Sequence, residues 1–234
     1  MRSWLQVVPN SRLHRRLLGA GRAGSVLFTA TFLIDGAFRP AYGTLRQPMS
    51  ALSLGPGGWV QASNFLVFGL LTCASAPGWR ASLAPGLGAV WYPRLKLAAG
   101  LMLIAAGVFS QDPALGYPPG IPAPATATLH SQIHNVVAVT ALGATVAGMF
   151  VLARRLRREP HWRVWGAYAA FSGGAMIAFL AAFGATLDQE KVGGLFEKLA
   201  TIAAAAFSIA MITRLLHQDA RLADTATALP APEM

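Results

Sequence analysis

Charged residues are scarce in this chain, and their scarcity excludes a water-soluble domain. Only 12% of the 234 residues are Asp, Glu, Lys or Arg, whereas 54% are hydrophobic. A soluble domain carries about 25% charged residues, so a globule of this composition would lack a polar surface. A disordered chain would contain far fewer apolar residues. The composition therefore predicts an integral membrane protein.

Cysteine and the common catalytic motifs are also scarce. The single cysteine, Cys73, lies in an apolar segment, so an intrachain disulfide is excluded and a packing role is favoured. The sequence contains no Walker loop, no Gly-x-Ser-x-Gly elbow and no His-Glu-x-x-His motif. The stretch Gly55–Gly58 lacks the lysine that a phosphate loop requires. These absences weigh against nucleotide-dependent, serine-hydrolase and zincin chemistry.

Acidic residues are few, and the net charge is +10. Such a charge suggests nucleic acid at first sight, but a nucleic-acid surface needs its basic residues on one soluble face. Here they are scattered between apolar segments. We therefore expect the lipid bilayer as a partner, and no nucleic acid.

Six apolar segments are each long enough to cross the hydrocarbon core, which takes about 20 residues of helix. Lipid offers no hydrogen-bond partner to an open backbone, so all six should be helices. We predict an all-α, polytopic bundle over residues 17–216, after a basic leader (1–16) and before a disordered tail (217–234). No small-x-small cleavage site follows the first segment, so we expect it to stay uncleaved. The predicted spans are Leu17–Ala37, Trp59–Trp79, Trp91–Phe109, Ile133–Leu152, Val164–Phe183 and Leu195–Leu216.

Lysine and arginine are distributed unequally between the two sides of this predicted bundle. With the N-terminus inside, 15 of the 19 fall in inner segments. The outer segments hold only Arg39, Arg46, Lys191 and Lys198. The bias predicts that both the N-terminus and the C-terminus face the cytoplasm.

No predicted span has a charged residue near its middle. Arg22 lies near the start of the first span, and Arg94 and Lys96 lie near the start of the third. Long side chains in such positions can reach the headgroups. An ion-coupled pump needs a charged relay at the midplane, so this pattern does not favour a transporter.

Two predicted outer loops are long, at about residues 38–58 and 110–128. The second is rich in proline between Asp112-Pro113 and Pro124, which prevents a helix and favours an extended, polyproline-like path. Unstructured loops of more than about 12–15 residues tend to be functional or disordered. We predict a rigid lid over the outer mouth of the bundle, with an inert spacer as the alternative.

His130 and His134 stand four residues apart at the outer start of the fourth span, on one helix face. This spacing suits a metal or a proton relay, but zinc takes three or four protein ligands. Outer carboxylates such as Asp112 or Glu197 would have to complete such a site. The simpler interpretation is that both histidines bond to outer-loop carbonyls. We therefore predict no cofactor, and the two histidines are weak metal candidates.

Other polar residues gather at the predicted outer ends of the spans. Asp35 and Arg39, four apart, predict an ion pair whose role is either functional or a simple interfacial cap. An amide within a membrane helix, such as Gln61 or Asn64, commonly bonds to another helix. We predict that Arg46, Asn64, Asp112 and His134 converge at the outer third of the bundle. The full candidate ligand-binding cluster is Asp35, Arg39, Arg46, Ser50, Gln61, Asn64, Asp112, His130, His134 and Glu197.

Three blocks on the predicted outer side carry a family resemblance. The chain resembles the domain of unknown function 998 family of six-helix integral membrane proteins from bacteria and archaea. The resemblance implies a bacterial plasma (inner) membrane location and names no activity. It covers nearly the whole chain, and its blocks are Arg39-Pro40-Ala41-Tyr42 with residues 45–61 and Asn64-Phe65; Phe109, Asp112-Pro113, Gly116, the proline-rich loop and His130…His134; and Gly194-Leu195-Phe196-Glu197.

The chain departs from the family pattern in its outer cluster. Where that pattern reads Tyr-Asp-Pro-Leu-Arg-His-Pro, this chain has Gly43 in place of the acid and Gln47 in place of the histidine. Asn135 stands where an Asp often follows the second histidine. These departures put in doubt any metal site that relatives hold here.

Three function classes remain open. The first is a non-enzymatic membrane protein with a polar outer-side pocket for a lipid, a small ligand or another membrane protein. The second is a membrane-embedded, metal-dependent lipid hydrolase, in which a zinc-bound water would attack a lipid amide near Ser50, Asp112, His130 and His134. The third is a small transporter subunit. The weak catalytic inventory favours the first.

Overall fold

The computed structural model describes residues 12–86, 88–186 and 192–227, and it confirms the all-α bundle of six apolar helices. The described part contains no β-strand, and an isolated bridge joins Ala114 to Tyr117. The elements are α1 (Arg12–Phe38), the short 3-10 helix η2 (Met49–Ser53), α2 (Gly58–Leu83), α3 (Gly88–Val108), α4 (Leu129–Arg157), η3 (Pro160–Trp162), α5 (Arg163–Ala185) and α6 (Gly193–Thr227).

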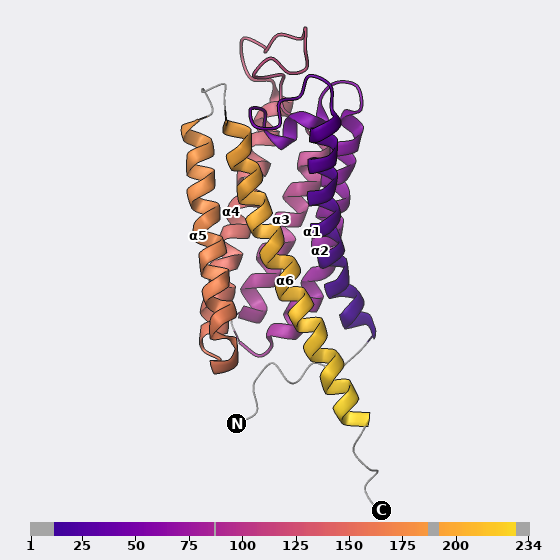
Figure 1. Ribbon diagram of the computed structural model, residues 1–234, viewed down its shortest axis with the longest axis vertical. Helices are drawn as coiled ribbons and strands as arrows, with labels where there is room; N and C mark the ends of the chain where they lie inside the picture. Colours follow the sequence, from indigo (N-terminus) through magenta and orange to yellow (C-terminus); the bar gives the residue numbers. More distant parts are fainter. Residues whose placement is uncertain (1–11, 87, 187–191, 228–234) are drawn as a thin grey trace, which may run out of the picture.

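The six helices run side by side along the long axis of the molecule (Figure 1), and their contacts close them into a ring. Each long helix packs against the next one in the chain, and α6 packs against α1. Short connections account for the neighbours α2–α3 and α4–α5, whereas residues 39–57 and 109–128 form long connections. A ring of six helices leaves space along its axis, and this space becomes the candidate site described below.

Two ends of the ring differ in chemistry. At the end that we call the arginine end, α4 finishes with Arg154, Arg155 and Arg157. A buried core that includes Trp79, Leu152 and Trp162 closes the ring there. At the opposite end, the cap end, lie η2 and residues 109–128, over a core that includes Phe28, Phe32, Tyr42, Leu52 and Tyr117.

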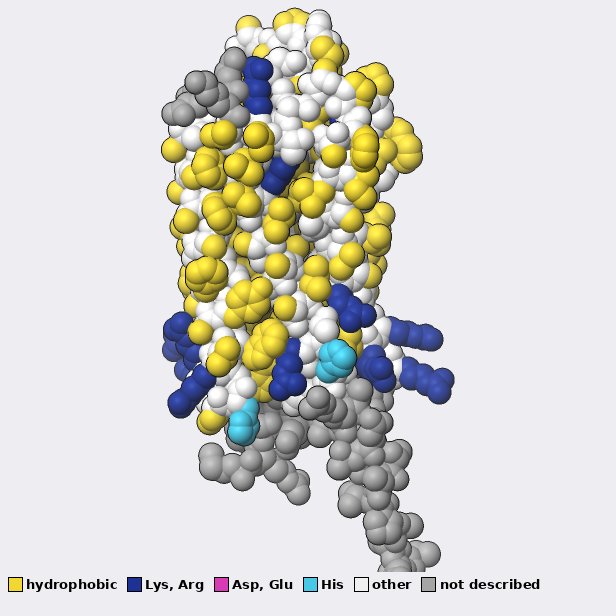
Figure 2. Space-filling model, in the orientation of Figure 1, with side chains coloured by type: hydrophobic (Ala, Val, Ile, Leu, Met, Phe, Trp, Pro, Cys, Tyr) yellow, Lys and Arg dark blue, Asp and Glu magenta, His cyan; other side chains and the backbone are white. Residues whose placement is uncertain are grey.

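The sides of the ring are apolar. All six long helices have the length and hydropathy of membrane spans. Large side chains such as Val139 (70% exposed) and Phe171 (72% exposed) point outward. Figure 2 shows hydrophobic side chains along the length of the face that it draws, with most lysine and arginine side chains near the arginine end. Such a surface is stable against lipid rather than water.

The helix boundaries correct two sequence expectations. Helix α3 begins at Gly88, so Lys96 is the ninth of its 21 residues and lies about 12 Å from its start, not near the beginning of a span. Helix α6 continues to Thr227, so the tail expected to be disordered from residue 217 begins as a helix. Three predicted features lie partly or wholly outside the described residues. These are the leader at residues 1–11, Lys191, and the tail at residues 228–234.

The contact between α2 and α3 gives a test of the packing. A Cβ at Gly100 would lie 2.5 Å from Cys73 Sγ and 2.8 Å from the Gly69 carbonyl oxygen, whereas a Cβ at Gly143 meets nothing within 4 Å. We expect Gly100→Ala to destabilise the protein by about 1–3 kcal/mol through overpacking. Gly143→Ala should be neutral or slightly stabilising, because alanine is the better helix former. Thermal unfolding of both variants in one detergent measures the difference, and equal midpoints would contradict this packing.

Candidate functional site: a capped central cavity

An elongated cavity lies inside the ring. It has a volume of about 120 Å³ and is lined by residues from all six long helices and from η2. Most of its wall is apolar, including Phe28, Phe65, Leu103, Ala141 and Phe207. An apolar wall with a few convergent polar groups is typical of small-molecule sites, although most of these are larger, at about 300–1,000 Å³.

The cavity is narrow for its length. On α4 its lining residues run from His134 to Met149, and on α6 from Glu197 to Ser208. At 1.5 Å per helical residue these stretches span about 22 Å and about 16 Å. An engineered cavity of about 150 Å³ holds one benzene molecule, so a volume of about 120 Å³ spread over this length takes one slender chain only where the helices separate around it.

The cap closes one end of this cavity. We use this name for residues 39–57, which connect α1 to α2 and include η2. Within η2, Met49 and Ser50 are buried and line the cavity, and Leu52 is completely buried. The cap therefore lies on the axis of the ring rather than beside it.

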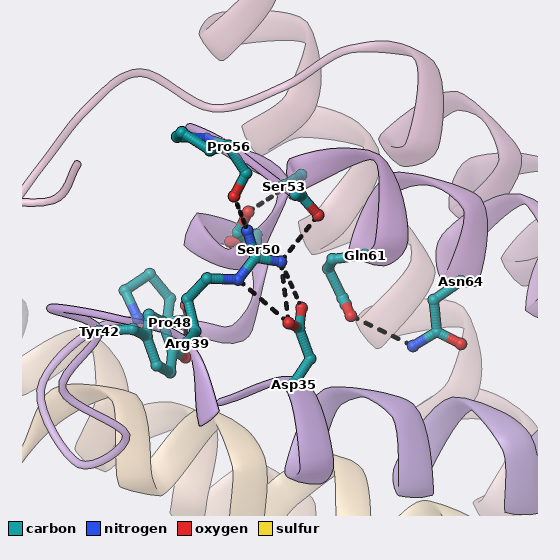
Figure 3. A network of polar contacts seen from close by, with 10 residues as sticks. Asp35, Arg39, Tyr42, Pro48, Ser50, Ser53, Pro56, Gln61 and Asn64 are labelled. Carbon is teal, nitrogen blue, oxygen red and sulfur yellow. Dashed lines mark hydrogen bonds and ion pairs between the residues drawn. The ribbon is translucent and has the colours of Figure 1, made fainter. Parts of the chain in front are cut away.

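Arg39 fastens the cap to the end of α1. Its guanidinium group donates to both carboxylate oxygens of Asp35 and also to the carbonyl oxygens of Pro56 at 2.6 Å and Gly57 at 2.8 Å (Figure 3). Gly57 has φ +83°, and a Cβ there would lie 2.9 Å from Arg39 Nη1, so glycine is required at this contact. The hydrogen bond to Asp35 raises the pKa of Arg39. The predicted ion pair is thus present, and its arginine also binds the backbone of the cap.

The first turn of α6 fastens the cap from the other side. The amides of Gly194 and Leu195 donate to the carbonyls of Arg46 and Leu45 at 3.0 and 2.9 Å. A helix N-terminus has free N–H groups that need such partners. A Cβ on Gly194 would overlap the backbone of residue 47, so the close approach depends on glycine.

Two adjacent charged residues of α6 complete this attachment. Glu197 Oε2 accepts the Met49 amide at 2.6 Å, and Lys198 Nζ donates to the Gln47 carbonyl at 2.7 Å. Lys198 is only 3% exposed, and Glu197 lines the cavity. Adjacent residues of a helix do not share a face, so the two side chains were expected to have separate partners. In the structure these partners are Met49 and Gln47, which lie close together in the cap.

Tyr42 and Gln47 tie the cap together internally. Tyr42 Oη lies 3.1 Å from the Gln47 carbonyl and 3.0 Å from the Pro48 carbonyl, to which it donates. Burial raises the pKa of Tyr42, so the phenol stays protonated as a donor. Gln47 Oε1 accepts the Gly43 amide, and Gln47 Nε2 donates to the Leu115 carbonyl at 3.0 Å. The two positions that depart from the family pattern therefore contact each other.

The second loop is fastened through Asp112. Its carboxylate accepts bonds from the Thr128 amide at 2.8 Å and the Thr128 hydroxyl at 2.6 Å. Its own amide donates to Ser131 Oγ. Burial alone would raise the pKa of Asp112, but the hydrogen bonds from Thr128 and Ser131 lower it. Thr128 is also the N-cap of α4, so Asp112 positions the start of that helix.

The two predicted histidines have different surroundings. His134 is buried, and its Nδ1 donates to the Phe109 carbonyl at 2.7 Å, as the simpler interpretation expected. In the neutral ring, Nε2 is then an acceptor, and His134 lines the cavity. His130 is exposed and lies edge-on against the Phe109 ring. The pair does not form one polar site.

The remaining candidates lie around the cap rather than in one cluster. Asn64 Nδ2 donates to the Phe28 carbonyl at 3.1 Å and to Gln61 Oε1 at 3.2 Å, which links α2 to α1. Arg46 is half-buried in the cap with its guanidinium near Gly116, and Ser50 Oγ donates to Gln111 Oε1. No hydrogen bond joins Asn64, Asp112 or His134 to one another within the described residues.

Three of the ten candidate residues line the cavity, namely Ser50, His134 and Glu197. The sequence did not indicate that Tyr42, Gln47 and Lys198 hold the cap, or that Thr72, Lys96 and Ser208 line the cavity. One feature of the sequence pointed to Lys198. It is a charged residue at the start of an apolar span, and it directly follows the family block that ends at Glu197. For a metal, the described part of the chain offers no group of three or more His, Cys, Asp or Glu side chains close enough to share an ion.

Six apolar helices closed into a ring define a multi-pass α-helical membrane protein. The sequence model of the family described as "Protein of unknown function (DUF998)" matches residues 22–214, from α1 to α6. The chain belongs to this family, and the sequence resemblance is confirmed. Neither the comparison with curated proteins nor that with solved structures finds a match.

Removal of the Arg39 side chain tests the attachment of the cap. The Asp35–Arg39 pair is buried, with side-chain exposures of 15% and 6%. We expect Arg39→Met to cost about 3–5 kcal/mol, because it leaves a buried carboxylate and two carbonyls without their partner. Amide hydrogen exchange over residues 45–57 should become much faster. The matched control is Arg155→Met, which breaks a second, largely buried i,i+4 pair, with Glu159, at the arginine end. Equal effects of both variants on cap exchange would contradict the assignment.

Asp112 predicts a specific pH dependence. A carboxyl with a lowered folded-state pKa stabilises the protein above its unfolded value of about 3.9, and that contribution is lost as the pH falls through the folded value. We expect Asp112→Asn to lower the thermal midpoint at pH 7. The difference from wild type should shrink as both proteins are acidified below about pH 4. A constant difference at both pH values would show that the Asp112 charge does not fasten Thr128.

Proposed function

We propose that this protein is a non-enzymatic lipid-binding protein of the bacterial plasma membrane, whose central cavity holds one hydrocarbon chain. The observation that carries the proposal is the cavity itself, which is narrow, elongated, mostly apolar and capped at one end. An apolar chain gains free energy from leaving a polar environment, roughly 0.8 kcal/mol per buried methylene. Inside the bilayer the gain is smaller, so shape fit to the cavity supplies the selectivity.

Four residues of the predicted outer cluster hold the cap and the second loop in place. Asp35, Arg39 and Glu197 use their charges to hold the cap, and Asp112 holds the second loop. Ser50, His134 and Glu197 line the capped end of the cavity. The apolar wall beyond them takes the hydrocarbon chain of a ligand.

We place the cap end outside the cell and the arginine end in the cytoplasm. The supporting observation is the arginine cluster at the end of α4, at Arg154, Arg155 and Arg157. Basic residues stay preferentially on the cytoplasmic side of a plasma membrane. In this orientation both the N-terminus and the C-terminus are cytoplasmic, and the cavity is closed toward the periplasm by the cap.

The hydrolase alternative requires a zinc site with three or four protein ligands. His134 already uses Nδ1 for the Phe109 carbonyl, and His130 is exposed and packs against the Phe109 ring. Because these two histidines do not share a site, we propose lipid binding rather than metal-dependent hydrolysis.

A photoreactive long-chain alcohol tests the proposal. The protein in lipid nanodiscs is irradiated with an alcohol that carries a terminal diazirine, and mass spectrometry locates the cross-links. We expect cross-links at cavity residues such as Leu103 and Ala204, and an approximately tenfold loss when Ala141→Phe fills the cavity. The matched control, Val139→Phe, places the same ring on the lipid-facing side of α4, where Val139 is 70% exposed.

The outcome distinguishes a cavity ligand from surface lipid. Cross-links confined to outward-facing residues in the wild type would overturn the proposal. Thermal unfolding shows whether Ala141→Phe still folds. If it does not, Ala204→Leu on α6 narrows the same cavity with a smaller side chain and serves as the second variant.

A further inference from the structure

Lys96 lies in an unusual position for a lysine. It is within α3 and about 12 Å from the start of that helix, and it lines the central cavity. It forms no hydrogen bond or ion pair with any described residue. An ammonium group within the hydrocarbon region is costly unless it is paired. The acidic residue that lines this cavity within the described part of the chain is Glu197, which lies at the cap end.

Two hydroxyl groups in the same cavity also lack partners. Thr72 on α2 is 2% exposed and Ser208 on α6 is 8% exposed, and the side-chain oxygen of each is buried without a hydrogen bond. Hydroxyls in helices commonly donate to a carbonyl one turn back, as Ser25 and Thr145 do in this cavity. A buried hydroxyl without a partner costs free energy, which a ligand could recover.

Lys96 and Thr72 lie at the same level of the ring. Cys73 Sγ is 3.8 Å from the Leu97 carbonyl oxygen, so these two residues face each other across α2 and α3. Thr72 and Lys96 immediately precede them in the sequence. Because the rise is 1.5 Å per residue, both lie within a few ångströms of that level along the axis.

Ser208 shares this level. A Cβ on Gly21 of α1 would lie 2.8 Å from Ser75 Cβ and 3.3 Å from Ile212 Cδ1, so these three residues are level. One helical turn toward the cap leads from Ile212 to Ser208 and from Ser75 to about Thr72. One ammonium and two hydroxyl donors from α2, α3 and α6 thus surround the same section of the cavity.

We propose that Lys96, Thr72 and Ser208 form a binding site for the anionic headgroup of a single-chain amphiphile. This site, the anion site, deepens the proposed function and depends on it, since the chain occupies the cavity wall toward the cap. Lys96 supplies the positive charge for a carboxylate or phosphate monoester, and the two hydroxyls donate to its oxygens. The narrow cavity admits one chain, so a two-chain phospholipid does not fit.

Matched photoreactive probes test the anion site. Diazirine-bearing dodecanoate and the corresponding dodecanol differ only in the headgroup. We expect wild-type protein in neutral-lipid nanodiscs to cross-link the acid at cavity residues at least about tenfold more than the alcohol, because a desolvated ion pair favours the acid. Lys96→Met should abolish this preference, so that the acid and the alcohol label the cavity equally.

Control variants separate the site from general electrostatics. Arg22→Met removes an exposed positive charge from α1 and should leave the preference for the acid intact. The double variant Thr72→Val, Ser208→Ala removes both hydroxyl donors while keeping Lys96, and should reduce the preference by a smaller factor. It also tests the site if Lys96→Met does not fold.

Competition identifies the source of the anion. Unlabelled dodecanoate and dodecyl phosphate should both displace the acid probe, and the better competitor shows whether carboxylate or phosphate is preferred. Displacement by inorganic phosphate alone would overturn the amphiphile assignment in favour of a free anion.

The remaining labelling outcomes distinguish failure of the anion site from failure of chain binding. Equal cavity labelling by acid and alcohol in the wild type would overturn the anion site and leave chain binding standing. Absence of cavity labelling by both probes would overturn the proposed function and the anion site together. A preference that survives in Lys96→Met would assign the headgroup to another residue.

Discussion

The structure depends on how a non-helical connection satisfies its backbone at the end of a membrane bundle. In apolar surroundings each unpaired carbonyl costs free energy, so irregular backbone survives only where side chains or helix termini reach it. Here carbonyls of the cap accept from Arg39, Tyr42, Lys198 and the first turn of α6. The charged residues of this end therefore have a clear physical task, which is to hold residues 39–57 on the axis of the ring.

This attachment has a consequence for the interior. With the cap fixed between α1 and α6, the ring does not collapse at that end, and a cavity remains along its axis. At the other end, large buried side chains such as Trp79, Leu152 and Trp162 fill the space. The cavity thus lies between a polar, hydrogen-bonded closure and an apolar one. Lys96 and two unpaired hydroxyls, those of Thr72 and Ser208, line it between these two closures.

Some of this site could be predicted from the sequence and some could not. The Asp35–Arg39 pair followed from its i,i+4 spacing, and the bond from His134 to a loop carbonyl was one of two interpretations of a lone histidine pair. Lys96 was predicted to lie near the start of a span, because hydropathy locates a helix end only within a few residues. The helix begins three residues earlier than predicted, at Gly88, and Lys96 therefore lies in its interior. The contact between Gly43 and Gln47 was read as a loss relative to the family pattern, since pairing across a loop is invisible in a linear motif.

Composition and the length of its apolar segments determined that this chain is a six-helix membrane protein, because lipid permits few other solutions for the backbone. The tertiary structure decided which polar residues meet. The level at which Thr72, Lys96 and Ser208 face one another depends on the relative heights of α2, α3 and α6. Those heights are fixed by contacts between residues far apart in the chain, such as Gly21 with Ile212 and Gly194 with the cap, which no local pattern encodes.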